Sequence, residues 1–394
     1  MPAAADRVGL ALLGAGHFVI DMTVGAIPAF IPVFSDLFDL SDTRASMILG
    51  ASVVSSSAIQ PAFGWLADRR SSTWFVWGGV LVAALGLALA GLAGGYWLLL
   101  AAIVGSGLGV AAFHPEAARV ANHLAGDRKA TGVAWFSVGG NLGFAAGPLV
   151  AALFFPLMAD QRTTLVYLVP GVAVCLLLLA TADRIRHPVA PPAAARASSP
   201  RPHVPGVTLL VVVVTLRTWT QFGVLSIGPL FLQDARGLTT RETGFVVFAF
   251  SLAGALGTVA GAMMADRIGG RAMLVATTPV VAPLLAAFLL TDGAVSLVAV
   301  TAAGFVLLAS FSVTVVMGQE YLPHRLALAA GLMIGFAAIG SGALGLAWIG
   351  PLADLAGRET ALWAIVCLPL AATALSLLLP APYRVPAAPA EARA

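Results

Sequence analysis

A carboxylate and two basic side chains fall within six positions of an otherwise apolar stretch. The segment AAFHPEAARVANH, residues 111–123, places His114, Glu116 and Arg119 directly after AAIVGSGLGV. On a helix, Glu116 and Arg119 are i, i+3 neighbours and can pair on one face. Pro115 removes a backbone donor, so we expect a local bend that presents His114 and Glu116 at an irregular, hydrated turn.

This arrangement predicts a proton-binding site. A carboxylate whose partner or hydration changes between two conformations also changes its proton affinity. The alternative is structural: the Glu116–Arg119 pair caps the helix end and bonds the next loop. Glu320 is a second acidic candidate for proton coupling, in a similarly apolar stretch.

Two further ionisable residues interrupt apolar stretches, each at mid-length. Asp21 has His17 one turn earlier in GAGHFVIDMTVG, and Arg217 has Gln221 one turn later in VVVVTLRTWTQFG. We expect Arg217 and Gln221 to hold a polar or anionic substrate, while Asp21 and His17 lie close enough to sense its charge. Asp21 is also a candidate for proton coupling. The alternative is a permanent Asp21–Arg217 ion pair that only holds the two halves together. A lasting buried ion pair is by itself weak evidence for a stabilising role.

The elements that carry these residues are predicted to be membrane helices. The chain has 394 residues, of which 59% are hydrophobic and 10% charged, whereas a soluble domain has about 25% charged residues. Its apolar runs of about 20 residues are long enough to span a bilayer as helices, and they lack the alternation of a barrel. We therefore predict an all-α polytopic membrane protein with twelve transmembrane helices, at 8–34, 45–66, 74–93, 96–120, 130–155, 163–182, 207–232, 243–265, 272–290, 294–320, 326–350 and 361–379.

The placement of charges predicts the orientation. Arg and Lys are in excess over acids on the loops that share a side with the N-terminus, so both termini are expected in the cytoplasm. The first run reads as an uncleaved helix in the cell (inner) membrane. Cys175 and Cys367 fall inside predicted helices and imply neither a disulfide nor a metal site. The basic inner surface suits anionic lipid, with no nucleic-acid partner.

The sequence is built from two similar halves. We predict an N-terminal six-helix bundle over 1–182, a Pro/Arg-rich cytoplasmic linker over 183–206, a C-terminal bundle over 207–382 and a tail over 383–394. Three landmarks recur at nearly one offset: Asp68-Arg69 with Asp266-Arg267, Gly147-Pro148 with Gly350-Pro351, and Glu116 with Glu320. Such repeats are typical of transporters whose substrate site lies between the halves.

These residues resemble the major facilitator superfamily. GWLADRR (64–70) and its repeat GAMMADRIGGR (261–271) resemble that superfamily's gating loops, which implies gating roles for Asp68, Arg69, Asp266, Arg267 and Arg271. The first loop lacks the glycine expected after Arg70, and the second has Ala262 at the leading glycine. In the superfamily, the helices holding Asp21 and Arg217 line the central cavity, so the resemblance implies that the two residues face each other across it.

Two stretches resemble the fosmidomycin-resistance branch of proton-coupled drug exporters. They are GSGLGVAAFHPEAARVA and VGGNLGFAAGPLVAAL. In the second stretch Gly143 and Gly147 predict close helix packing, and Pro148 predicts a kink. Asn141 and Trp219 are candidates to line the cavity, with helix or lipid packing as the alternative.

The sequence argues against other classes of function. It has no G-x-S-x-G, H-E-x-x-H, Walker or CxxC motif, so neither an enzyme nor an ATP-driven pump is expected. The repeated gating loops favour a carrier over a channel. We predict a monomeric, cofactor-free transporter in the lipid bilayer that exports a small drug-like or polar/anionic metabolite in exchange for protons, by alternating access. Uptake by proton symport is the alternative.

Overall fold

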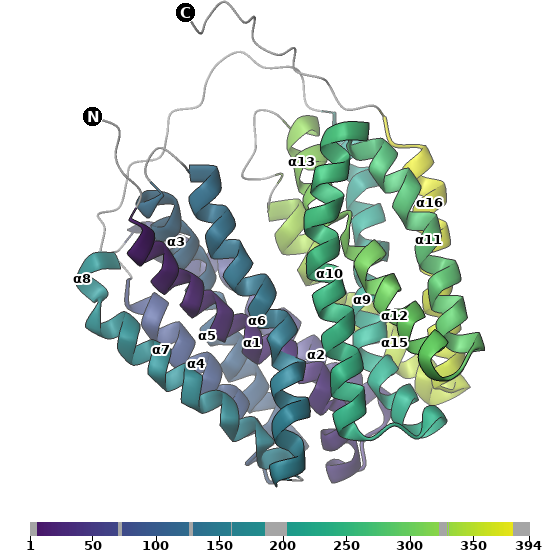
Figure 1. Ribbon diagram of the computed structural model, residues 1–394, viewed down its shortest axis with the longest axis horizontal. Coiled ribbons are helices and arrows are strands. Elements are labelled where there is room, and N and C mark those ends of the chain that lie inside the picture. Colours follow the sequence, from purple (N-terminus) through teal and green to yellow (C-terminus); the bar gives the residue numbers. More distant parts are fainter. Residues whose placement is uncertain are drawn as a thin grey trace, which may run out of the picture.

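The chain forms two bundles of long helices that lie side by side (Figure 1). The computed structural model describes residues 6–69, 73–125, 129–158, 160–185, 203–322, 329 and 331–380, and these ranges contain no strand. The side chains of residues 64, 65, 67–69, 122, 129–135, 266, 331, 334 and 338 lie outside this description.

The first bundle takes the N-terminal half of the chain (purple to teal in Figure 1). Its helices are α1 (Arg7–Phe38), α2 (Asp42–Val53), the π-helical turn η1 (Val54–Ala58), α3 (Gln60–Arg69), α4 (Trp74–Ala90), α5 (Tyr96–Leu124), α6 (Lys129–Met158), the 3-10 segment η2 (Gln161–Tyr167), α7 (Leu168–Ala180) and α8 (Ala182–Ile185).

The second bundle takes the C-terminal half (green to yellow). Its helices are α9 (Val204–Arg236), α10 (Thr240–Ile268), α11 (Gly270–Leu290), α12 (Gly293–Leu308), α13 (Phe311–Tyr321), the π-helical η3 (Gly331–Gly340), α15 (Ser341–Ala356) and α16 (Arg358–Leu377).

The predicted membrane architecture is confirmed. Within the described ranges, eleven helical segments are long and apolar enough to cross a membrane, and Trp74–Ala90 is a twelfth, shorter apolar helix. Four spans are less regular than predicted, and one of them is the sixth, predicted at 163–182, which begins with the 3-10 segment η2. The second contains η1, where the Ser55 hydroxyl donates to the Ala51 carbonyl at 2.7 Å and competes with the helical ladder. The tenth is interrupted between α12 and α13, and the eleventh includes η3.

The two halves repeat their turns as well as their motifs. In the first half, α1 ends at Asp39 with a left-handed φ of 47°, and Ser41 caps α2. In the second, α9 ends at Gly237 with a φ of 65°, and Thr239 caps α10 with a capping box. Asp39 and Gly237 are 198 positions apart, and so are Ser41 and Thr239. This is the same offset as that between Asp68 and Asp266. The pseudo-symmetry is therefore present in backbone conformation.

One end of the molecule is defined by helix termini. There α1 and α9 begin and α16 ends; we call it the terminal face, and the other end the opposite face (Figure 1). At the terminal face Asp6 caps α1 and also pairs with Arg184. Its hydrogen bond from the Gly9 backbone N–H holds the pKa of Asp6 below its ordinary value.

The two bundles contact each other near the opposite face. The Ser226 hydroxyl of α9 donates to the Ser46 hydroxyl of α2 at 2.9 Å. Gly350 of α15 lies against Thr43 at the start of α2, and Gly244 of α10 lies against Ala152 of α6. Because small residues occupy these contacts, the backbones approach closely and the bundles meet there.

Candidate functional site

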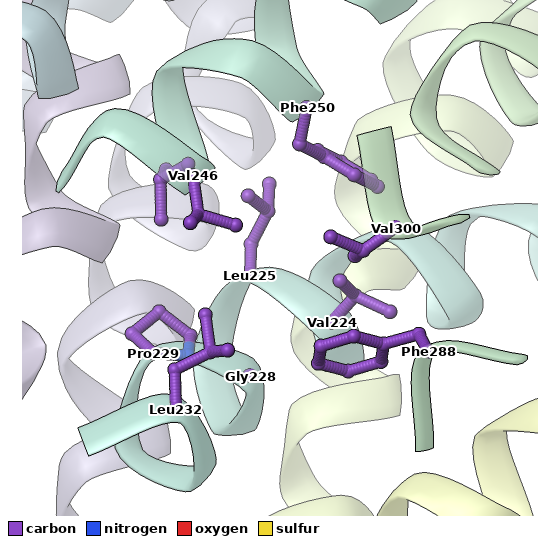
Figure 2. A pocket seen from close by; sticks show the side chains of 10 residues that line it. Val224, Leu225, Gly228, Pro229, Leu232, Val246, Phe250, Phe288 and Val300 are labelled. Atoms are coloured by element: carbon purple, nitrogen blue, oxygen red, sulfur yellow. The ribbon is translucent and has the colours of Figure 1, made fainter. Parts of the chain in front are cut away.

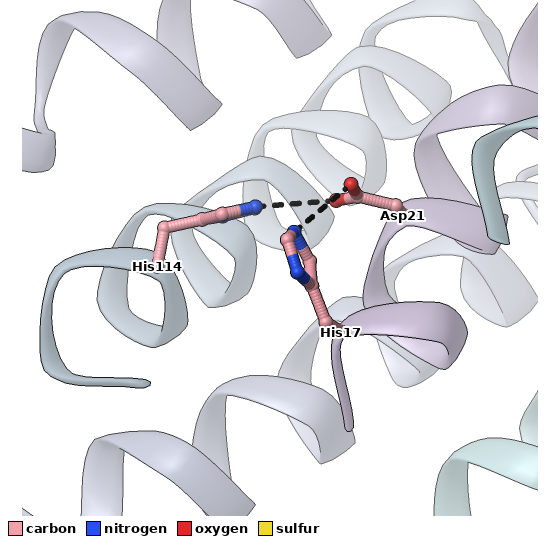
Figure 3. Close-up of side chains that lie close together, drawn as sticks. All are labelled: His17, Asp21 and His114. Atoms are coloured by element: carbon pink, nitrogen blue, oxygen red, sulfur yellow. Dashed lines mark ion pairs between the residues drawn. The ribbon is translucent and has the colours of Figure 1, made fainter. Parts of the chain in front are cut away.

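A buried acidic and histidine cluster lies inside the first bundle. His17 and Asp21 are one turn apart on α1, and His114 reaches them from α5 (Figure 3). The His17 Nε2 atom lies 3.2 Å from Asp21 Oδ2, and the His114 Nε2 atom lies 3.2 Å from Asp21 Oδ1. Each oxygen of one carboxylate thus faces one imidazole. We call these three residues the His–Asp–His cluster.

The outer nitrogens of the two imidazoles determine which tautomers are present. His17 Nδ1 lies 2.8 Å from the Phe136 carbonyl oxygen, and His114 Nδ1 lies 2.9 Å from the Val110 carbonyl oxygen. A carbonyl oxygen only accepts, so both Nδ1 atoms must donate. In the neutral imidazoles, Nε2 is then a bare acceptor that faces a carboxylate oxygen.

Two acceptors at hydrogen-bond distance repel unless a proton lies between them. Each 3.2 Å contact therefore needs a proton on the imidazole or on Asp21. The cluster has a net charge of −1 without such protons, 0 with one and +1 with two. The charge of the cluster therefore depends on how many protons it holds.

The helix α6 holds the cluster in place with glycines and one aromatic ring, that of Phe136, which stacks on the His17 ring with the ring centres 4.1 Å apart. Gly139, Gly143 and Gly147 lie directly against the α1 backbone, so α1 and α6 pack closely and leave no room for a Cβ at these positions. Gly140 faces the cluster itself: a Cβ there would overlap the His17 ring and the Asp21 carboxylate. The predicted close packing at Gly143 and Gly147 is present, and Gly140 is a site residue that sequence analysis missed.

The same three residues are also close enough to be considered as metal ligands. One ligand atom from each lies within 4.8 Å of the others. The Nε2–Oδ separations of 3.2 Å are hydrogen-bond lengths, however, and shared protons account for both contacts without a metal.

Glu116 and Arg119 form the predicted i, i+3 pair. Arg119 Nε donates to Glu116 Oε2 at 2.9 Å and its Nη2 donates to Oε1 at 2.5 Å, while the Glu116 side chain is 0% exposed. The expected hydrated turn is absent, because α5 continues through Pro115 as one helix and Glu116 is fully buried. A membrane helix can continue through a proline where neighbouring helices pack around it.

Arg217 lies deep in the second bundle. Its side chain is 2% exposed, its Nη1 lies 3.5 Å from the Ser310 hydroxyl, and its guanidinium carbon lies 5.3 Å from the centre of the Phe311 ring. The alternative of a permanent Asp21–Arg217 pair is not realised, since the ion pairs of Asp21 in the described chain are with His17 and His114.

The other candidate binding residues have mixed surroundings. The Trp219 Nε1–H donates to the Ser341 carbonyl at 2.8 Å, and its ring packs against Trp348, so Trp219 takes part in helix packing. Gln221 is half-buried and Asn141 is exposed. Among the described residues, neither of these two amides has a hydrogen bond.

The predicted gating residues are only partly visible. The side chains of Asp68, Arg69 and Asp266 lie outside the described residues. Arg267 is exposed, and Arg271 donates to the Leu377 carbonyl at 2.8 Å. Glu320 is half-buried on α13, with no ion pair in the part of the chain that the structure describes.

A charged network at the opposite face was not predicted. Arg358 at the start of α16 donates to both oxygens of Asp42 on α2, at 2.9 and 3.1 Å, and also to Asp234 at the end of α9. Asp354 of α15 accepts from the backbone N–H groups of Asp42 and Thr43. This network joins the two bundles. The available signal was a set of acids placed at the same end of three spans.

An apolar cavity lies within the second bundle, beside Pro229 of α9 (Figure 2). No polar side chain lines it, so it offers no group that would orient a polar solute. Its lining residues are Val224, Leu225, Gly228, Pro229, Leu232, Val246, Val247, Phe250, Phe288 and Val300.

The chain is similar in sequence to a protein family and to known proteins, one of which is named as an MFS-type transporter. Residues 13–344 match the Major Facilitator Superfamily. The fosmidomycin resistance protein of Escherichia coli (strain K12) is 31% identical over 380 residues, covering 92% of this chain and 91% of its own. The uncharacterized MFS-type transporter YfnC of Bacillus subtilis (strain 168) is 29% identical over 389 residues, covering 95% and 93%.

Solved structures share the fold. A bacterial homolog of the human lysosomal transporter Spinster, in an inward-facing and occupied conformation, superposes with a TM-score of 0.80 at 17% identity, covering 96% of this chain and 97% of that one. The nucleoside transporter NupG superposes with a TM-score of 0.76 at 13% identity, covering 94% and 99%. With its two helical bundles and a family match over most of its length, the chain is a transporter of the major facilitator superfamily, and not an enzyme.

Proposed function

We propose that this transporter exports a small polar solute in exchange for protons, and that the His–Asp–His cluster carries the protons. The observation that carries the proposal is the pair of Nε2–Oδ contacts at 3.2 Å, each of which requires a proton because both Nδ1 atoms donate elsewhere. The cluster is largely buried, with side chains 10%, 21% and 24% exposed, so its charge acts in a low dielectric.

The direction of transport is inferred from the name of one sequence relative and from the contacts that join the two bundles at the opposite face. The fosmidomycin resistance protein is named for resistance, which export would provide. The excess of Arg and Lys on the loops of the terminal face supports a cytoplasmic location for that face, in the inner membrane. The inter-bundle contacts at the opposite face then hold a conformation that loads its solute from the cytoplasm.

The Glu116–Arg119 pair has a different role in this proposal. Both Glu116 oxygens already accept from Arg119, and the carboxylate is fully buried. Two charge-assisted hydrogen bonds hold such a carboxylate in a fixed geometry. Glu116 therefore supports the helix α5 from which His114 reaches the proton site, and Asp21 is the carboxylate that exchanges protons.

Transport into vesicles tests the proposal. The full-length protein is reconstituted with its terminal face outward, and uptake of fosmidomycin is measured with an acidic interior and with the gradient collapsed. We expect accumulation only with the gradient, and loss of that dependence in Asp21→Asn. The control is Asp36→Asn, which removes an exposed carboxylate from the same helix and should transport as wild type does.

Three outcomes would count against the proposal. Gradient-driven accumulation that persists in Asp21→Asn would remove the cluster from the mechanism. Accumulation that follows protons in the same direction would establish symport in place of antiport. Inhibition by a chelator would show that a metal occupies the cluster, because a proton site is insensitive to chelation.

A further inference from the structure

The unused edge of the Arg217 guanidinium is the strongest unassigned feature of the second bundle. Arg217 Nη1 contacts Ser310, but Nε and Nη2 are buried without a hydrogen-bond partner among the described residues. No described acid forms an ion pair with Arg217, so its charge is buried against the Ser310 hydroxyl and the face of the Phe311 ring. A buried cation without a counter-charge is costly, and such groups are found where a ligand supplies the charge.

The two free atoms are on one edge of the guanidinium. Nε–H and the adjacent Nη2–H point in the same direction and match the two oxygens of a carboxylate, phosphate or phosphonate. A second arginine of this chain shows the same edge with a carboxylate bound to it: Arg119 donates from its Nε and Nη2 to the two oxygens of Glu116. Arg217 presents that fork with no protein carboxylate to fill it.

A helix terminus adds a second positive element beside the guanidinium. The span Gly293–Tyr321 is interrupted at Ala309–Ser310, and α13 begins at Phe311. Ser310 is the N-cap of α13, but its side chain makes no capping hydrogen bond. The N-terminus of a helix carries partial positive charge, and interrupted membrane helices point such termini at anionic substrate groups.

We infer that Arg217, Ser310 and the N-terminus of α13 form a binding subsite for an oxyanion, the charged group of the transported solute. The inference rests on the proposed transport function and narrows its substrate to carboxylate, phosphate or phosphonate compounds. Arg217 supplies two parallel N–H donors and the charge. The Ser310 hydroxyl, which accepts from Arg217 Nη1 and donates to the Leu307 carbonyl at 3.4 Å, and the Phe311 ring hold the guanidinium in place.

Thermal unfolding of the purified full-length protein in lipid nanodiscs tests the subsite directly, without transport. Inorganic phosphate, methylphosphonate and acetate are added separately, with choline chloride keeping ionic strength constant. We expect at least one oxyanion to raise the unfolding temperature of the wild type in a saturable manner. The three probes separate phosphate-like from carboxylate recognition.

Substitutions of Arg217 decide whether the shift arises at this site. Arg217→Met should abolish it, and Arg217→Lys, which keeps the charge but loses the fork, should weaken apparent binding about tenfold or more. Arg162→Met is the control, since Arg162 is 66% exposed on η2 and should leave the shift unchanged.

The unliganded proteins give a second readout. Arg217→Met should unfold at the same temperature as the wild type or higher, because the described protein has no acid that the change would leave unpaired. A lower unfolding temperature together with an unchanged oxyanion shift would overturn the inference, as would the absence of any oxyanion shift in the wild type. Should Arg217→Met not fold, Arg217→Lys with an undiminished shift would overturn it.

The same assay separates this inference from the proposed function. Asp21→Asn should lose gradient-driven transport but keep the Arg217-dependent oxyanion shift. A shift that survives while proton dependence is absent from the wild type would reject the proton mechanism and keep the oxyanion subsite. Proton-driven transport without any oxyanion shift would keep the proton mechanism and reject the oxyanion subsite.

Discussion

Asp354 accepts hydrogen bonds from the backbone N–H groups of Asp42 and Thr43, at 2.5 and 3.0 Å, so a carboxylate of one bundle caps a helix of the other. The capped terminus is that of α2, whose partial positive charge favours a nearby anion. Because the two residues belong to different bundles, this cap exists only while the opposite face is closed.

Removing the charge of Asp354 should open that face more often. Asp354→Asn loses the attraction to the α2 terminus and puts an amide beside two N–H donors, which we expect to cost the closed state about 1 kcal/mol. In a background with Cys175→Ser and Cys367→Ser, labelling of Gly50→Cys by an impermeant maleimide should be about fivefold faster. Gly50 faces Leu346 of the other bundle with room for a side chain.

The control for this experiment is Asp292→Asn. Asp292 is 83% exposed and pairs with Arg236 inside the second bundle. The Asp292→Asn substitution removes a paired acid from the second bundle and changes no contact between the bundles, so the labelling rate should stay the same. Equal labelling in both variants would mean that the Asp354 cap does not hold the face closed.

Arg358 should have a larger effect than Asp354. It joins Asp42 of the first bundle to Asp234 of the second, and Asp42 is buried. Arg358→Gln leaves two acids together without a cation and should cost the closed state about 2 kcal/mol. Adding Asp42→Asn should recover part of that loss. A strictly additive double variant, measured by the same labelling, would exclude direct coupling between the two residues.

Gly140 should be intolerant of even one methyl group. In Gly140→Ala the new Cβ overlaps the His17 ring and the Asp21 carboxylate, and displaces both. We expect gradient-driven transport to fall about tenfold or more. Gly105→Ala is the matched change, because no atom lies within 4 Å of a Cβ there and alanine favours the helix. Comparable loss in both variants would indicate a general helix effect.

Glu116 should prove more important for stability than for proton dependence. Glu116→Gln breaks a buried bidentate pair and should lower the free energy of unfolding by about 3 kcal/mol. Glu116→Gln with Arg119→Met should restore part of it. The transport that remains in Glu116→Gln should keep its pH-gradient dependence. Loss of that dependence in a stable, folded variant would transfer the proton-carrying role to Glu116.

The fold could be predicted because lipid imposes it. Length and apolar composition alone identify spans, and the 198-residue spacing of Asp68 and Asp266 identifies two halves. The Glu116–Arg119 pair was also predictable, since an i, i+3 spacing places both side chains on one helix face. Composition and spacing along the chain were sufficient in both cases.

Contacts between distant helices were not predictable in the same way. His17 and Asp21 were assigned to a site with Arg217, but it is His114 of α5 that completes their cluster. Helical periodicity predicts on which face of its helix a residue lies, but it does not predict which other helix packs against that face. The same limit hid Gly140 and the network around Arg358, whose members are separated by as many as 316 positions in the chain.

The small residues between the bundles have a mechanical consequence. Where Gly244 meets Ala152 and Gly350 meets Thr43, the helices contact each other through small groups close to their backbones. Rocking about such a pivot requires little repacking, so polar contacts at the rim set most of the barrier to reorientation. Bulky replacements at this pivot would therefore slow turnover while leaving solute affinity nearly intact.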